Sequence, residues 1–124
     1  MSIQYQKEPG LAGIADAHRS AIGRTFEELT TPALLLHIDV LRRNIAAMAE
    51  WTKTHAKIRP HTKVHKCVEI ARLQVHAGAI GLTTATVWEA SAMARAGLDN
   101  LLIANEVVAN INVFGAGGDR RIVG

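Results

Sequence analysis

The stretch A-G-A-I-G-L-T-T-A-T-V-W-E-A-S-A-M-A-R-A-G-L-D-N-L-L-I-A, residues 77–104, decides the fold. Its apolar runs and their spacing predict a strand over 80–85, a helix over 87–96 and a second strand over 101–104. An Ala-Gly pair precedes each strand, and the two glycines, Gly78 and Gly97, are nineteen residues apart. A strand-to-strand spacing near twenty residues is typical of successive βα units, so the sequence predicts an α/β fold with a parallel sheet.

The residues before this stretch continue the alternation of strand and helix. Residues 68–76 form a predicted helix, and residues 41–55 form another, with Asp39 as its N-cap. The apolar face of the second helix consists of Leu41, Ile45, Met48 and Thr52. A continuous apolar run over 33–38 predicts a buried strand that opens after Pro32.

We therefore expect three parts: a leader of residues 1–30 with one short helix, a folded part over 31–108, and a glycine-rich tail over 109–124. A further helix would begin after Val108, but Gly-Ala-Gly-Gly at 115–118 is a poor helix interior. The tail lacks the lysine and the Ser/Thr of a phosphate-binding loop, so it favours a frayed chain end.

The composition excludes several classes of protein. The 124 residues are 48% hydrophobic and 20% charged, which is an ordinary globular balance and argues against a disordered or fibrous chain. No apolar stretch approaches the ~18 residues of a membrane span, and residues 1–10 lack the apolar core of a secretory signal. The single cysteine, Cys67, excludes an internal disulfide, and we expect a cytoplasmic protein without a membrane partner.

The net charge of +3 is concentrated in one segment. Its basic residues are Lys53, Lys57, Arg59, Lys63 and Lys66, interleaved with His55, His61 and His65. If residues 57–66 form an extended strand, the odd positions share one basic face and the even positions share a mostly apolar one. An exposed edge strand would explain this pattern, since lysines on edges oppose aggregation. A strand buried between two helices would instead need an anion or a catalytic use for its cationic face.

A lysine on such a face has a chemical use. Neighbouring cations and burial both disfavour the protonated amine, and a neutral amine attacks carbonyl carbons to form a Schiff base. Pyridoxal 5'-phosphate, an anionic aldehyde, fits both demands. His61 and His65 also match H-x-x-x-H, but on a strand they would lie roughly 13 Å apart, too far to share one metal ion.

Four segments together resemble one enzyme family. They are T-P-A-L-L-L-H-I-D at 31–39, R-P-H-T-K-V-H-K at 59–66, G-L-T-T-A-T-V-W-E-A at 81–90 and L-L-I-A-N-E-V at 101–107. They resemble the D-threonine aldolase and D-serine dehydratase branch of the alanine-racemase-like, fold-type III pyridoxal-phosphate enzymes. The R-P-H-x-K-x-H-K element is the most specific of the four.

The resemblance implies the N-terminal part of a (β/α)8 barrel that is truncated here, with the strand of 33–38 belonging to a β-rich domain. The first motif lysine, Lys63, would hold pyridoxal 5'-phosphate at the C-terminal end of the first barrel strand. Arg59, His61 and His65 would contribute to cofactor binding. It also implies a D-amino acid substrate, a homodimer, and a divalent metal whose ligands are absent here.

The sequence departs from the family at two positions. His37 replaces an acidic residue, and Val64 replaces a threonine next to Lys63. A complete barrel takes about 250 residues, so we expect a fragment that is poorly stable and essentially inactive alone.

Alternatives remain open at this point. Within the family, the activity is a retro-aldol cleavage to glycine and an aldehyde, a D-serine dehydration, or a racemisation. Outside it, the basic segment would suit a nucleic-acid-binding module, although no aromatic residue interleaves the cluster after Trp51. A non-catalytic remnant that inherits the motif is the third alternative.

Overall fold

The computed structural model describes residues 19, 21–29, 31–107 and 122–123, and it divides the chain into two compact units, Met1–Leu36 and His37–Gly124. In the first unit, the short 3₁₀-helix η1 (Phe26–Glu28) lies within the predicted leader, of which residues 1–18 lie outside the described residues. Its N-cap Thr25 and its third residue Glu28 form a capping box, in which the Thr25 N–H donates to the Glu28 carboxylate at 2.8 Å.

The strand predicted over 33–38 is wrong. Residues 33–37 are irregular, and Ile38 already belongs to the following helix. Leu34 is 92% exposed, so the run is not buried. An apolar strand forms only where a second strand accepts its hydrogen bonds, and none of the described strands pairs with this run.

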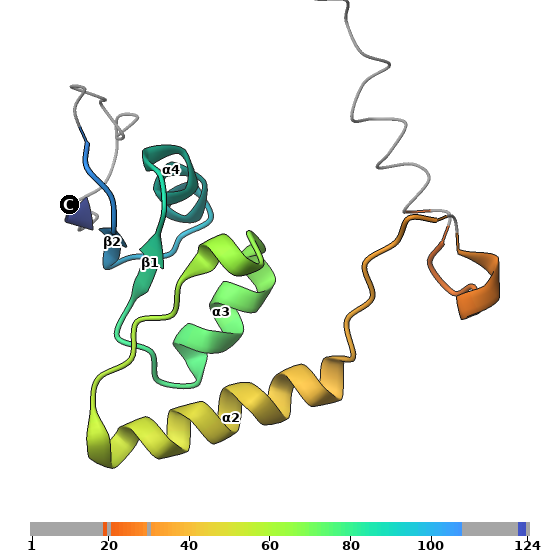
Figure 1. Ribbon diagram of the computed structural model, residues 1–124, viewed down its shortest axis with the longest axis horizontal. Coiled ribbons are helices and arrows are strands. Elements are labelled where there is room, and N and C mark those ends of the chain that lie inside the picture. The colour runs from red at the N-terminus through yellow and green to blue at the C-terminus, as the bar shows by residue number, and fades with distance from the viewer. Residues whose placement is uncertain (1–18, 20, 30, 108–121, 124) are drawn as a thin grey trace, which may run out of the picture. The chain divides into compact units, whose positions relative to one another are not determined.

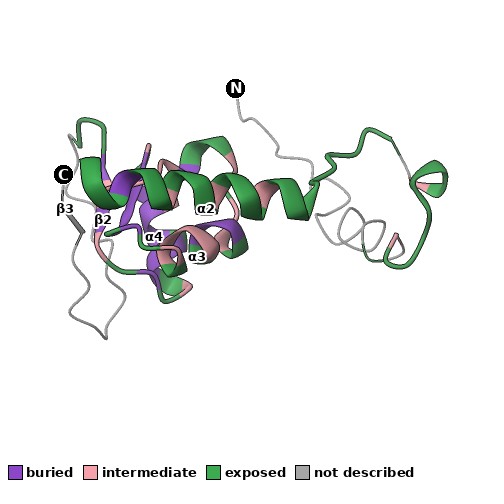
Figure 2. Cartoon of the chain, turned by 90° about the horizontal axis from the view of Figure 1, so that it is seen from below, coloured by how far each residue is buried: buried purple, intermediate pink, exposed green. Residues whose placement is uncertain are grey.

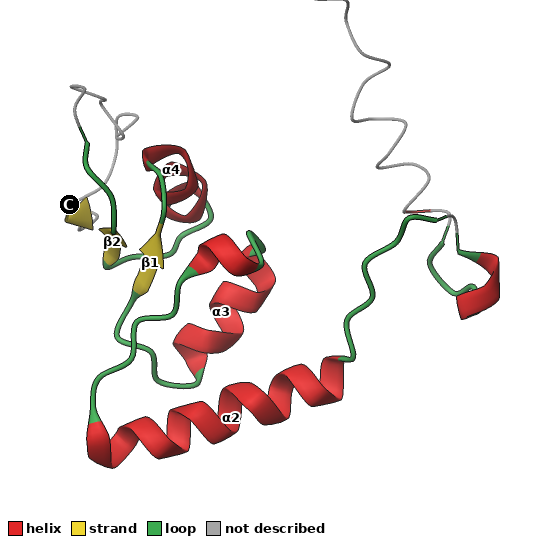
Figure 3. Cartoon of the chain, in the orientation of Figure 1, coloured by secondary structure: helices red, strands yellow, loops and turns green. Residues whose placement is uncertain are grey.

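Between residues 68 and 103 the second unit alternates helix and strand along the chain (Figures 1 and 3). Its elements are α2 (Ile38–His55), the 3₁₀-helix η2 (Thr62–Val64), α3 (Val68–His76), β1 (Leu82–Thr84), α4 (Val87–Arg95), β2 (Leu101–Ile103) and β3 (Ile122–Val123). The described strands form one parallel sheet in the order β1-β2-β3, with Leu82 opposite Leu101 and Leu101 opposite Ile122. The predicted parallel sheet and its βα order are confirmed.

The nineteen-residue repeat has a structural basis at the ends of α3 and α4. Gly78 and Gly97 both have positive φ, at 111° and 88°, a conformation that glycine adopts without strain. After each helix the chain closes the same turn, since Ala79 N–H donates to Gln74 O and Leu98 N–H donates to Met93 O, both at 3.1 Å. These are Schellman-type C-caps, which direct the chain into β1 and β2.

The core lies between the sheet and the helices α3 and α4, where Figure 2 shows the buried residues gathering. Leu82 and Leu101, opposite each other on β1 and β2, are fully buried. The remaining core residues are Ala71, Val87, Ala90, Met93, Ala94, Leu98 and Ile103, with Val68 and Val75 packed against them. Two of the core residues on α4, Ala90 and Ala94, are small side chains, which suit close packing of a helix on a sheet.

Helix α2 begins at Ile38, with His37 as its N-cap, three residues before the predicted start. It packs against α3 with the predicted residues Leu41, Ile45 and Thr52 turned inward, whereas Met48 is half exposed. The rest of α2 faces solvent in Figure 2. Among the described helices, none is long and apolar enough to cross a membrane.

The predicted strand over 57–66, with Lys63 at its end, does not form: His61 makes only an isolated parallel bridge with Thr83. Residues 58–61 run parallel to β1, with Ile80 N–H donating to Ile58 O at 3.0 Å and Thr83 N–H donating to Pro60 O at 2.7 Å. The chain then turns into η2, so Lys63 and His65 do not continue the alternating face. The tail predicted over 109–124 lies outside the described residues, apart from β3.

Candidate functional site

The carboxyl ends of neighbouring parallel strands lie at one edge of the sheet, and His61 and Asn105 are among the polar residues there. His61 ends the extended segment beside Thr83, and Ala85 follows β1. Asn105 follows β2 and its amide donates to Ala85 O at 3.3 Å, which joins two of these loops. In parallel α/β folds this edge carries the binding and catalytic residues.

The motif turn after His61 is held by its own side chains. Thr62 is fully buried, and its hydroxyl donates to Thr83 O at 3.2 Å. The His61 Nδ1 atom accepts from the Lys63 N–H at 3.2 Å, and the His65 Nδ1 atom accepts from the Cys67 N–H at 3.0 Å. His61 therefore caps η2, which is the physical reason that the extended segment ends there.

Lys66 is the last residue of the turn, and its φ is +47°. Its N–H donates to Thr62 O at 2.7 Å, and its ammonium lies 2.9 Å from the carboxylate of Glu89 on α4. The other carboxylate oxygen of Glu89 accepts from the Ala85 N–H at 2.9 Å. The Ala85 hydrogen bond and then Lys66 hold the pKa of Glu89 below its usual value.

Lys63 differs from every other polar residue of the motif. It is exposed, and its amine has no hydrogen bond or ion pair with any described residue. Arg59, His61, Thr62, His65 and Lys66 all have partners within the chain. The turn thus presents a single unengaged amine, at the end of the sheet where chemistry is expected.

Arg59 lies on the opposite side of β1 from its partner, Asn100. Its guanidinium donates to both the backbone oxygen and the side-chain oxygen of Asn100, the latter at 2.9 Å. Gly81 makes room for this crossing, because a Cβ there would overlap Arg59 Nη1 and Asn100 O. The structure therefore gives Arg59 a partner within the sheet, and its contact with a cofactor stays a prediction.

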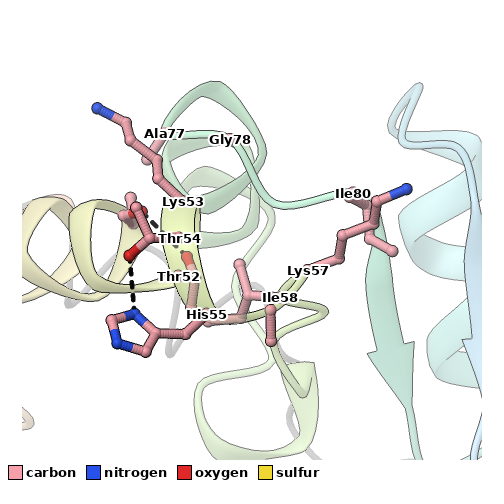
Figure 4. Close-up of a pocket in the computed structure, with 11 residues that line it drawn as sticks. Thr52, Lys53, Thr54, His55, Lys57, Ile58, Ala77, Gly78 and Ile80 are labelled. Atoms are coloured by element: carbon pink, nitrogen blue, oxygen red, sulfur yellow. Dashed lines mark hydrogen bonds between the residues drawn. The ribbon is translucent and has the colours of Figure 1, made fainter.

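The basic segment is divided between the two ends of the sheet. Lys53, His55 and Lys57 line a pocket of about 420 Å³ near the start of the strands, between the end of α2 and the loop at Ile80 (Figure 4). In Figure 4 the amines of Lys53 and Lys57 extend away from each other. Lys63 and Lys66 lie beyond His61, at the other end. The sequence alone does not separate these two groups.

Glu89 and Asn100 are not among the site residues that the sequence predicts. Thr86 and Glu89 form the pattern T-x-x-E, and Thr86 indeed caps α4 by accepting from the Glu89 N–H at 3.2 Å. That pattern is a signal for a helix start, but it does not reveal Lys66 as a partner. No group of three or more His, Cys, Asp or Glu residues within the described ranges is arranged to hold a metal ion.

The lowered pKa of Glu89 predicts a pH dependence of stability. Its contribution is fully present above the pKa of an unfolded glutamate, about 4.3, and is lost as the pH falls through the lower folded value. Urea unfolding at about pH 6 and about pH 3 measures the loss. We expect this loss of stability to be smaller in Glu89→Gln than in the wild type. Glu50→Gln removes an exposed ion pair with Lys53 and should leave the loss nearly unchanged. Equal losses in wild type and Glu89→Gln would contradict the prediction.

Comparison with known proteins identifies the family. Residues 36–113 match the family described as "Alanine racemase, N-terminal domain". The chain belongs to this family. The alanine-racemase-like fold that the resemblance implied is confirmed, and the described sheet is a small N-terminal part of its barrel.

Three similar proteins carry related activities in their names. The 3-hydroxy-D-aspartate aldolase of Paracoccus denitrificans is 40% identical over 87 residues, covering 68% of this chain and 22% of its own length. The crystal structure of D-threonine aldolase from Filomicrobium marinum has a TM-score of 0.63 and 46% identity, covering 65% of this chain and 22% of that one. A D-threo-3-hydroxyaspartate dehydratase variant has a TM-score of 0.67 and 33% identity, covering 77% and 25%. The chain therefore spans about a fifth to a quarter of their lengths.

Proposed function

We propose that this alanine racemase N-terminal domain supplies the cofactor lysine, Lys63, of a pyridoxal-phosphate lyase that acts on β-hydroxy-D-amino acids. The observation that carries the proposal is the unengaged amine of Lys63 within a turn whose other polar residues are all partnered. An engaged lysine such as Lys66 is a poorer nucleophile, because its ammonium is bound to a carboxylate.

The residues around Lys63 fit an anionic aldehyde. The Nε2 atom of His65 is buried and has no hydrogen-bond partner among the described residues, and a ligand acceptor would satisfy it. Lys66 adds positive charge that attracts a phosphate-bearing ligand. We propose that Lys63 holds the cofactor covalently and that His61 and His65 help to bind it. When bound, pyridoxal phosphate supplies an electron sink for the bond broken at Cα.

The names of the relatives favour retro-aldol cleavage, in which a D-β-hydroxy-amino acid gives glycine and an aldehyde. Dehydration is the second candidate, because one structural relative is a dehydratase. We further propose that the whole protein uses a divalent metal. We infer that the residues that distinguish the two reactions lie in the part of these relatives that this chain does not span, since the chain covers 22% and 25% of their lengths.

A chimaera tests the proposal. Residues 36–107 replace the matching segment of the Filomicrobium marinum D-threonine aldolase, and glycine formation from D-threonine is measured. We expect the chimaera to retain activity and its Lys63→Ala variant to lose it, while the 124-residue chain alone gives no turnover. A chimaera that folds, binds pyridoxal phosphate and remains equally active after Lys63→Ala would overturn the assignment.

A further inference from the structure

Glu89 connects two loops at the carboxyl edge of the sheet. Its side chain is only 13% exposed although it carries a charge. One carboxylate oxygen contacts the Lys66 ammonium at 2.9 Å, and the other accepts from the Ala85 N–H at 2.9 Å. A largely covered carboxylate needs such partners, and these two contacts use both of its oxygens.

Lys66, which contacts Glu89, belongs to the same turn as Lys63. Thr62 O accepts from both His65 N–H at 3.1 Å and Lys66 N–H at 2.7 Å, which makes residues 62–66 one hydrogen-bonded turn. Lys66 leaves this turn in a left-handed conformation that is costly for a residue with a side chain. Its ion pair with Glu89 offsets part of that cost and fixes the turn against α4.

We propose that Glu89 is a positioning residue: by binding Lys66, it holds the motif turn in place and leaves Lys63 as the amine of that turn that is available to an aldehyde. The inference rests on the proposed function of Lys63. The pairing gives the second lysine of the R-P-H-x-K-x-H-K motif a distinct role from the first.

Two measurements on the full chain test the link. Amide hydrogen exchange reports whether residues 62–67 open, and borohydride fixation of pyridoxal phosphate followed by peptide mapping reports which lysine reacts. We expect Glu89→Gln and Lys66→Met each to speed exchange of 62–67 by about three- to tenfold, as the loss of a charged hydrogen bond implies. In Glu89→Gln, the share of label on Lys66 rises at the expense of Lys63.

The controls separate positioning from general stability. The double variant Lys66→Met/Glu89→Gln is expected to exchange no faster than either single variant, and Lys66→Arg to retain slow exchange, because the charge remains. Glu69→Gln is the control. Glu69 lies in the first turn of α3 and accepts a hydrogen bond from the Cys67 thiol, not from a lysine, so we expect this variant to keep the label on Lys63.

The exchange and labelling results distinguish failure of this inference from failure of the proposed function. Unchanged exchange of 62–67 and unchanged labelling in both single variants would show that Glu89 only caps α4, and would overturn the inference. Additive effects in the double variant would do the same. If wild-type Lys63 takes up no label, the proposed function fails, and the exchange data still decide whether Glu89 holds the turn.

Discussion

Lys63→Met removes most of the covalent uptake of pyridoxal phosphate by this chain, whereas Lys57→Met retains it: this is the largest chemical effect that we expect. The amine of Lys63 is exposed and unengaged, and Lys66 is bound to Glu89. Borohydride reduction followed by peptide mapping measures the result. Lys66 must give up its ion pair with Glu89 before it reacts with an aldehyde, and Lys63 has no such contact to lose, so the label belongs on Lys63.

Lys57 is the matched control for non-specific reaction. It is exposed as well, and it has no hydrogen bond or ion pair with the described residues. Pyridoxal without the phosphate should label Lys57 and Lys63 alike, because the selectivity comes from the cationic turn that attracts the phosphate. Label on Lys66 with Lys63 unmodified, or equal labelling of Lys57 and Lys63 by pyridoxal phosphate, would refute the assignment.

The elements predicted well are those with local signals. The predicted helix over 68–76 matches α3 at both ends, and the helix over 87–96 ends within one residue of α4. Both helices terminate at Ala-Gly pairs whose glycines supply the positive φ that the turn requires. A signal of this kind depends only on neighbouring residues, which a sequence shows directly.

The elements predicted poorly depend on partners far along the chain. The apolar run of 33–38 has the composition of a strand, but strand formation needs a second strand, and none of the described strands pairs with it. In the motif, alternation predicts a continuous strand to 65, yet the His61 ring accepts the Lys63 N–H and turns the chain. An alternating sequence pattern does not show that a side chain competes with a neighbouring strand for a backbone hydrogen bond.

The candidate site shows the same division. The motif indicated Lys63, His61 and His65, and the structure places them in one turn. Glu89 contacts Lys66 in this turn, and Asn100 contacts Arg59 beside the sheet. In each pair the two residues are more than twenty positions apart in the sequence. Only the folded arrangement of parallel strands brings these pairs together.

Gly81→Ala is expected to cause the largest loss of stability. A Cβ at this position would overlap Asn100 O and Arg59 Nη1. Asn100 O also accepts the Leu82 N–H at 3.1 Å, so it does not move away without breaking the pairing of β1 with β2. Overpacking and a lost charged hydrogen bond together cost about 3 kcal/mol, which lowers the melting temperature by more than about 10 °C in a domain of this size.

Thermal unfolding followed by circular dichroism measures this loss, and Gly78→Ala is the control. A Cβ at Gly78 meets nothing within 4 Å, so this variant adds only the strain of its positive φ, about 1–2 kcal/mol. Arg59→Ala removes one of the two overlaps at Gly81. The loss of unfolding free energy in the double variant Gly81→Ala/Arg59→Ala should therefore be smaller than the sum of the losses in the two single variants. The losses caused by Gly78→Ala and Arg59→Ala should instead be additive. If Gly81→Ala melts within a degree or two of the wild type, Arg59 does not cross β1 at Gly81, and the sheet is not held by the Arg59–Asn100 contact.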